Sequence, residues 1–340
     1  MRHVNIPVFI PHLGCPNQCV FCNQRFISGV RKFDPGDLVK IIEKSLSTVS
    51  EDDFVEIAFF GGSFTGIDRS LMTRLLEIAD KYVESGVVKS VRCSTRPDYI
   101  DEEIIGILKK HHVDVVELGL QSVSDRVLFE TKRNHTFADE KKACKMITDA
   151  GIRLVGQMMI GLPFSTLEDE LETADFIINS GAEAARVYPT VVFKETELCE
   201  MTSLGLYTPL TLDDAVVRAA RVVSEFRKAG IQVIRIGLCS SDNLSSDNSY
   251  FAGPNHPALG ELVENQIYFD KIINLAKNFN LNEDSVLCVN VPQGSLSKAV
   301  GQKKRNKTLL INSLGIKDVI FSESRDVEKD EVLLTLRKDT

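Results

Sequence analysis

The sequence predicts an α/β protein: a TIM-like (β/α) barrel, complete or partial, followed by a small α+β unit. Short β-branched apolar runs alternate with amphipathic stretches over about two thirds of the 340 residues. This alternation indicates right-handed βαβ units and a parallel sheet. The end of the chain changes to a β-α-α-β pattern. In a barrel of this kind the chemistry lies at the carboxyl ends of the strands.

The barrel elements follow from hydrophobic periodicity. The predicted strands are the short apolar runs at residues 4–9, 55–60, 87–93, 113–118, 154–160, 184–187 and 233–236. Between them, apolar residues recur at three- and four-residue steps, which is typical of helices. The predicted helices are residues 35–46, 69–83, 101–111, 138–150, 166–179 and 213–228. Asp34 and Thr166 are favourable helix starts, and Gly151 is a favourable helix end.

We expect three segments along the chain. Residues 1–236 form the barrel, residues 237–280 hold a polar loop and a helix at 257–279 that close it, and residues 281–340 form a small basic unit. The expected elements of the last segment are strands at 285–291, 318–322 and 332–336 and helices at 295–300 and 305–314.

The composition limits the class of protein. Hydrophobic residues make up 43% and charged residues 26% of the chain, as in ordinary globular proteins. No apolar run approaches the roughly 18 residues that a membrane span needs, and the N-terminus does not read as a signal peptide. We therefore expect a cytoplasmic protein that does not engage membranes. The net charge of −8 argues against nucleic-acid binding over the whole surface but permits a local basic patch.

Three of the eight cysteines crowd into one loop. Cys15, Cys19 and Cys22 have the spacing C-x3-C-x2-C after the first predicted strand, and the others are scattered singly. Structural zinc takes four ligands, usually as two separated pairs, and an ordinary [4Fe–4S] cluster takes four thiolates. Three thiolates without an obvious fourth imply an iron with an open coordination position. A zinc site completed by a histidine such as His12 is the alternative, and Cys239 is a candidate redox or auxiliary ligand.

The cysteine spacing, with the aromatic Phe21 before the third cysteine, resembles the signature of the radical S-adenosylmethionine (SAM) superfamily. The resemblance implies a [4Fe–4S] cluster held by the three cysteines, with SAM chelating the open iron. It implies one-electron cleavage of SAM to methionine and a 5′-deoxyadenosyl radical, with an electron donor such as flavodoxin or ferredoxin. The motifs assign no residue to hydrogen transfer. Tyr188, Arg186 and Tyr207 lie near the later strand ends, and the catalytic residues stay unassigned.

Strings after other strand ends resemble the catalytic subunit of Elongator and the oxygen-independent coproporphyrinogen oxidases. Gly61, Gly62 and Ser63 resemble the GGE-type motif that holds the SAM amino group, with Ser63 in place of the acidic residue. Gln121 and, twelve residues later, Arg133 match residues that contact the SAM ribose and carboxylate. An arginine suits a carboxylate because its guanidinium donates two parallel hydrogen bonds.

Further matches and two departures place the chain within this group. Met159 precedes a GLP-type loop and is a candidate to pack on adenine, and residues 188–190 match the Elongator-like YPT string. Ser94, a further candidate cofactor contact, stands where the coproporphyrinogen oxidases have glutamate, and no Tyr-x-His precedes the cysteines. Porphyrinogen decarboxylation is therefore not expected. We expect a stand-alone Elongator-like protein without an acetyltransferase domain.

The last segment carries a basic turn, which consists of Lys298, Lys303, Lys304, Arg305 and Lys307. A helix, a glycine-containing turn and a second helix between strands resemble a KH domain, whose GxxG loop clamps a nucleic-acid backbone. Gly301 matches the first glycine, but Lys304 stands in place of the second. A lysine-rich turn can still contact phosphate, and a solvated basic turn on a small docking domain is the alternative.

The leading functional hypothesis is a radical SAM enzyme that acts on an RNA base, with tRNA as the first candidate. A second hypothesis keeps the enzyme but gives it a small-molecule or peptide substrate. A third is a non-catalytic iron–sulfur sensor or RNA-binding protein. Gln121 and Arg133 speak against the third, because such a protein needs no SAM pocket.

Overall fold

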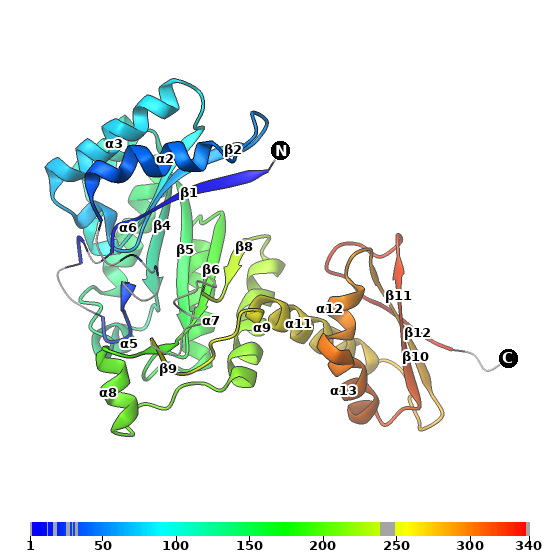
Figure 1. Cartoon of the computed structure of the whole chain (residues 1–340). Coiled ribbons are helices and arrows are strands. Elements are labelled where there is room, and N and C mark those ends of the chain that lie inside the picture. The colour runs from blue at the N-terminus through cyan, green and yellow to red at the C-terminus, as the bar shows by residue number, and fades with distance from the viewer. Residues whose placement is uncertain are drawn as a thin grey trace. The chain divides into compact units, whose positions relative to one another are not determined.

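The computed structural model describes residues 2–11, 13–15, 19–24, 28, 30, 33–238 and 249–337, and Figure 1 shows the chain as a ribbon. His12 and Cys239, two of the candidate ligands named above, lie outside the described residues. The chain divides into two compact units. One consists of Met1–Ala215 and Glu225–Pro257, and the other of Val216–Ser224 and Ala258–Thr340.

The first unit is built on a seven-stranded parallel sheet that curls into a partial barrel (Figure 1). Its strands are ordered β1 (His3–Phe9), β2 (Phe54–Phe60), β3 (Ser90–Thr95), β4 (Val113–Gln121), β5 (Arg153–Ile160), β6 (Ala184–Pro189) and β8 (Gln232–Ile236). Among the described residues, neither β1 nor β8 has another strand on its outer side, so these two are the edges. The sequence analysis did not decide between a complete and a partial barrel, and the structure shows a partial one.

Helices connect the strands, and the longer ones between β1 and β6 cover the outer face of the sheet (Figure 1). They are η1 (Pro35–Asp37), α2 (Leu38–Leu46), η2 (Phe64–Gly66), α3 (Arg69–Glu84), η3 (Pro97–Tyr99), α4 (Glu102–Lys110), α5 (Asp125–Glu130), α6 (Phe137–Asp149), α7 (Leu167–Asn179), α8 (Glu197–Ser203) and α9 (Leu212–Lys228). Thr136 and Thr166 begin α6 and α7 with capping boxes, because each exchanges hydrogen bonds with an aspartate three residues on.

The structure corrects several predicted boundaries. The third strand begins at Ser90 rather than at Val87, because Val87 is 49% exposed and the Val88 amide donates to the Tyr82 carbonyl in the turn after α3. The sequence analysis missed α5 and α8, which are too short to show a helical period. It also missed a two-stranded ribbon formed by β7 (Val192–Phe193) and β9 (Tyr250–Ala252).

The second unit has a three-stranded sheet in the order β11-β10-β12. Its elements are α11 (Leu259–Ala276), β10 (Val286–Pro292), α12 (Leu296–Val300), η4 (Gln302–Lys304), α13 (Arg305–Leu314), β11 (Asp318–Ser324) and β12 (Leu333–Leu336). These confirm the elements predicted for the last segment to within three residues at each end. Strand β10 pairs in parallel with β11 and antiparallel with β12.

The core of the second unit lies between α11 and the sheet. Tyr268 and Ile272 of α11 are buried against Leu287 and Val289 of β10 and Leu310 of α13. The structure thus groups α11 with the second unit, whereas the sequence analysis placed residues 257–279 in a segment that closes the barrel. Across the described residues, every helix is too short or too polar to cross a lipid bilayer.

Candidate active site

A cavity of about 950 Å³ occupies the inside of the partial barrel. It is lined by every residue that the sequence assigned to the cluster or to SAM: Cys15, Cys19, Phe21, Cys22, Gly61, Gly62, Ser63, Ser94, Gln121, Arg133 and Met159. Most of these residues lie on loops after β1 and β2 and near the carboxyl ends of β3, β4 and β5, which meet at one edge of a parallel sheet. Arg133 comes from the connection between α5 and α6. The structure brings them together, and their individual roles stay predictions.

The three thiols of the cysteine loop face the same space. Burial, followed by the charges of Cys19 and Cys15, raises the pKa of Cys22 to about 12. The Cys15 Sγ lies 3.5 Å from the Ser63 Oγ, which joins the loop to the turn after β2. No three His, Cys, Asp or Glu side chains in the described part of the chain gather tightly enough to hold a metal ion. The donor set, three thiols on one cavity, nevertheless fits the ligand chemistry of an iron–sulfur cluster.

Two guanidinium groups converge on Cys19, which is 6% exposed. The Arg133 Nη1 lies 3.3 Å and the Arg96 Nη1 3.9 Å from its Sγ. These cations offset the negative charge that a thiolate ligand carries. The buried Nε of Arg133 has no hydrogen-bond partner among the described residues, so this guanidinium keeps a donor for a group that enters the cavity.

Arg96 is itself held by a buried chain of polar side chains. Its Nε and Nη2 donate to the two carboxylate oxygens of Asp98, at 2.9 and 3.0 Å, and Nη2 also donates to the Arg133 carbonyl. The Nδ1 of His135 lies 3.7 Å from Asp98, and its Nε2 lies 3.0 Å from the Glu140 Oε1. The sequence strings contained Arg96 and Asp98, but no motif assigned them to the cluster.

Burial shifts the pKa values of His135 and Glu140, the last two of these polar side chains. It raises the pKa of Glu140 well above its usual value and, with Arg133 and Arg96, lowers the pKa of His135 to about 2. Burial therefore favours the neutral forms of both the Glu140 carboxyl and the His135 imidazole, which share a hydrogen bond at Nε2. Neither residue was identified from the sequence, because a histidine five residues before a glutamate has no distinctive spacing.

Glycines allow the cysteine loop to pack directly on the turn after β2. At Gly14 (φ 77°) an added Cβ would lie 2.2 Å from the Ser63 carbonyl oxygen, and at Gly66 it would lie 2.6 Å from the Gly14 carbonyl oxygen. Gly61 (φ 97°) approaches the Ile10 backbone, where a Cβ would lie 3.1 Å from the nitrogen. Only glycine tolerates these positions. The sequence pointed to Gly61 and missed Gly14, although it directly precedes the first cysteine.

A register shift at the end of β4 positions Gln121. The pairing of β4 with β5 shifts between Gly119 and Gln121, and Gln121 has φ 74° while 4% exposed. Such bulges re-aim side chains next to active sites. The Arg133 Nη2 donates to the Gly119 carbonyl, and the Gln157 Nε2 lies 3.5 Å from the Gln121 Oε1. The bulge therefore brings the two predicted SAM contacts to one wall of the cavity.

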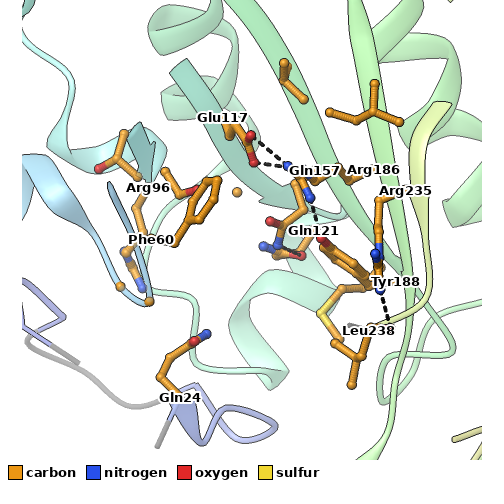
Figure 2. Close-up of a pocket in the computed structure, with 18 of the residues that line it drawn as sticks. Gln24, Phe60, Arg96, Glu117, Gln121, Gln157, Arg186, Tyr188, Arg235 and Leu238 are labelled. Carbon is orange, nitrogen blue, oxygen red and sulfur yellow. Dashed lines mark hydrogen bonds and ion pairs between the residues drawn. The ribbon is translucent and has the colours of Figure 1, made fainter. Parts of the chain in front are cut away.

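Buried ion pairs cross the middle of the barrel. Arg92 lies between two carboxylates, with Nη2 2.6 Å from Glu56 and Nη1 2.9 Å from Glu117. Arg186 approaches Glu117 through Nε at 2.8 Å and donates to the Tyr188 hydroxyl at 3.1 Å. Figure 2 shows Glu117, Arg186 and Tyr188 on the cavity wall. We call Glu56, Arg92, Glu117 and Arg186 the ion-pair chain.

Of the three residues named near the later strand ends, Arg186 and Tyr188 line the cavity. The third, Tyr207, is not among the lining residues. Its hydroxyl donates to the Gly161 carbonyl at 2.6 Å, which ties the segment after α8 to the loop after β5.

Comparison with protein families and curated proteins agrees with this geometry. Residues 9–177 match the radical SAM superfamily, and residues 182–268 match a radical SAM C-terminal domain. An uncharacterized protein of Methanocaldococcus jannaschii is 31% identical over 62% of this chain and 67% of its own length. A tRNA uridine(34) acetyltransferase of the same organism is 31% identical over 45% of this chain and 29% of its own length.

The chain also resembles Elongator proteins. Human Elongator complex protein 3 is 30% identical over 43% of this chain, which spans 28% of that protein's length. The solved structure of Elp3 from Methanocaldococcus infernus with an N-terminal deletion has a TM-score of 0.63 at 24% identity and covers 79% of this chain and 63% of that one, which shows a shared fold. The matched residues include the cysteine loop, so the chain belongs to the radical SAM superfamily, whose members are enzymes that use a [4Fe–4S] cluster and SAM.

Proposed function

We propose that this chain cleaves SAM reductively and modifies a base in RNA, with tRNA as the first candidate. The enzymatic half rests on one observation: the three thiols, the Gly61 turn, Gln121 and Arg133 line a single cavity in a partial barrel. The RNA half is supported by the relative named as a tRNA uridine(34) acetyltransferase and by the basic turn of the second unit.

Each predicted cluster or SAM residue then has a proposed role. Cys15, Cys19 and Cys22 hold the cluster, which together with bound SAM supplies a 5′-deoxyadenosyl radical. Arg133 binds the SAM carboxylate through the donors it has left, because its Nε is unpartnered and its Nη1 already faces Cys19. Gln121 contacts the ribose from its bulge beside Arg133.

The remaining SAM contacts use backbone and apolar groups. The carbonyl groups of the turn at Gly61, Gly62 and Ser63 accept from the amino group, because glycine lets that backbone approach closely. Met159 packs against the adenine from β5, and Ser94 and Phe21 complete the wall. The walls exclude water from the reacting atoms, which protects a radical from side reactions.

The basic turn is the proposed RNA contact. Gly301, Lys303 and Lys304 all have positive φ (77°, 51° and 63°), so the chain reverses sharply before α13. Lys307 pairs with Asp318 at 2.9 Å, whereas Lys303 and Lys304 are exposed and have no ion pair among the described residues. Together with Arg305, they place positive charge where α13 begins, and phosphate is favoured at the first amides of a helix. Lys298 lies in α12, 3.9 Å from Glu264.

The enzymatic half is tested by anaerobic reconstitution with iron and sulfide, reduction with dithionite, and measurement of 5′-deoxyadenosine. Wild-type protein should form it and Cys19→Ala should not, because two thiolates cannot hold the cluster that SAM requires. The matched control is Cys93→Ala, a buried cysteine of β3 that does not line the cavity and should leave the product intact. Reconstituted wild-type protein that forms no 5′-deoxyadenosine would refute the proposal.

The RNA half is tested by the salt dependence of tRNA binding. Lys303→Glu/Lys304→Glu should weaken binding and reduce the slope of log K against log salt by about 1.5, because each lost phosphate contact contributes roughly 0.7–0.9. The control is Lys109→Glu/Lys110→Glu, two exposed lysines at the end of α4 with the same change of charge. If both double variants change binding equally, the turn is not an RNA site.

A further inference from the structure

Arg235 lines the cavity without a carboxylate partner among the described residues, whereas Arg92, Arg153 and Arg186 each face a glutamate. Arg235 lies near the carboxyl end of β8, and the strand register pairs it directly with Arg186 of β6. Both residues line the cavity, and their guanidinium groups have different partners: that of Arg186 contacts Glu117, and that of Arg235 contacts backbone carbonyls. Figure 2 shows Arg235 beside Tyr188 and Leu238.

The nearby carboxylate is already engaged by other arginines. The Glu117 carboxylate lies 2.8 Å from the Arg186 Nε and 2.9 Å from the Arg92 Nη1. Arg235 instead donates from Nε to the Gly237 carbonyl at 3.1 Å and from Nη2 to the Leu238 carbonyl at 2.8 Å. Among the described residues, no Asp or Glu lies within ion-pair distance of Arg235.

The two carbonyl contacts orient this guanidinium without neutralising it. A guanidinium has five N–H donors, and two of them are used here. A half-buried cation without a carboxylate partner is costly unless an anion reaches it. An arginine held in a fixed orientation, with donors left over, is well suited to bind an oxyanion through two parallel hydrogen bonds.

The position of Arg235 separates it from the cofactor contacts. The cysteine loop follows β1, and β1 and β8 are the two edges of the sheet. The SAM carboxylate is already assigned to Arg133, which contacts Cys19. An anion at Arg235 is therefore most simply part of the substrate.

We propose that Arg235 binds a phosphate group of the substrate nucleotide at the β6–β8 wall of the cavity. This proposal rests on the proposed function, because RNA supplies phosphates and no carboxylates. Arg235 acts here as a substrate-binding residue, whereas Arg186 on the neighbouring strand stays paired with Glu117.

The test is a cycle of two changes, one in the protein and one in the ligand. The ligands are the dinucleotide UpU and its methylphosphonate analogue, whose single linkage is uncharged. Their affinity for the reconstituted holoenzyme with SAM is measured by calorimetry. Wild-type protein should bind UpU about tenfold more tightly than the analogue, as expected for one charge-assisted contact. Arg235→Gln should bind the two ligands equally, and Arg235→Lys should keep part of the difference.

The matched control is Arg153→Gln, which removes another cavity-lining arginine, one that faces Glu56 at 3.4 Å. It should keep the preference for UpU. The proposal is overturned if wild-type protein shows no preference for the charged linkage, or if Arg235→Gln keeps the preference. It is also overturned if Arg235→Gln weakens SAM binding as much as UpU binding, which would assign the residue to the SAM carboxylate.

These outcomes are separate from a failure of the proposed function. If wild-type protein forms no 5′-deoxyadenosine, the proposed SAM cleavage is wrong. If it does not bind tRNA, the proposed RNA substrate is wrong. An active, tRNA-binding protein with no charge preference at Arg235 removes this inference alone.

Discussion

The middle of the barrel cavity and its mouth hold their arginines in opposite ways. In the middle, Arg92 is buried between the carboxylates of Glu56 and Glu117. At the mouth, Arg133 faces the Cys19 sulfur and the Gly119 carbonyl, and Arg235 faces the carbonyls of Gly237 and Leu238. The first group is neutralised by the protein itself, whereas most donors of the second group face atoms that carry no full charge in this structure.

We infer that the buried ion pairs stabilise the fold and that the arginines at the mouth are available to bind a ligand. A buried ion pair with good geometry leaves little capacity for another partner, and losing one member exposes the other to a large desolvation cost. A guanidinium held by carbonyls or sulfur keeps its charge available. Variants in the middle of the barrel should therefore change stability, and variants at the mouth should change ligand affinity.

The largest effect is expected in the ion-pair chain. Arg92→Met leaves Glu56 and Glu117 buried with fewer partners, which should lower the free energy of unfolding by about 3–5 kcal/mol. Arg153→Gln is the matched control, since Arg153 is 42% exposed and 3.4 Å from Glu56, and it should cost less than about 1 kcal/mol. Urea denaturation measures both. Equal losses would mean that the buried chain does not stabilise the barrel.

An intermediate effect is expected at the mouth from Gly119→Ala. The added Cβ would lie 2.9 Å from the Gln121 Nε2 and 3.5 Å from the Arg133 Nη2, so both predicted SAM contacts must shift. We expect SAM affinity to fall about tenfold, or about 1.4 kcal/mol, with little change in stability.

Gly106→Ala in α4 is the control for Gly119→Ala, because a Cβ there meets nothing within 4 Å. It should leave SAM binding unchanged and stabilise the helix by about 0.5–1 kcal/mol. Calorimetry with SAM and urea denaturation of both variants distinguish the two effects. Unchanged SAM affinity in Gly119→Ala would contradict the assignment of Gln121 and Arg133.

The last expected effect is a pH dependence of stability that separates Glu140 from the charged residues around it. Its pKa is raised by burial, so Glu140 takes up a proton on folding, and its contribution to stability falls as the pH rises above about 4.5. Glu140→Gln has no such proton, and its amide still donates to the His135 Nε2. The variant should gain stability relative to wild type between pH 5 and 8, by at most about 1.4 kcal/mol per pH unit.

The lowered pKa of His135 destabilises both proteins as the pH falls below about 6.5, so it cancels in this comparison. Urea denaturation at each pH measures the difference. A difference that does not vary with pH would show that Glu140 is charged in the fold.

Local sequence patterns predicted much of the fold and many of the residues that line the cavity. The strand periods predicted the seven sheet strands, with one displaced by three residues at its start, and the cysteine spacing placed three thiols on one loop. The double glycine at Gly61 and Gly62 marked the turn that this loop packs against. Such signals survive in the sequence because the residues that make them are neighbours along the chain. The short elements α5 and α8 left no comparable period.

The sequence by itself determined the alternation of strands and helices, the spacing of the three cysteines and the basic turn. Only the tertiary structure decided which side chains meet inside the barrel. Arg96 and Arg133 reach Cys19 across 77 and 114 residues, and Arg235 stands beside Arg186 because β6 and β8 pair in that register. No local pattern encodes such pairings, since the register of parallel strands is set by packing between segments that are distant in the chain.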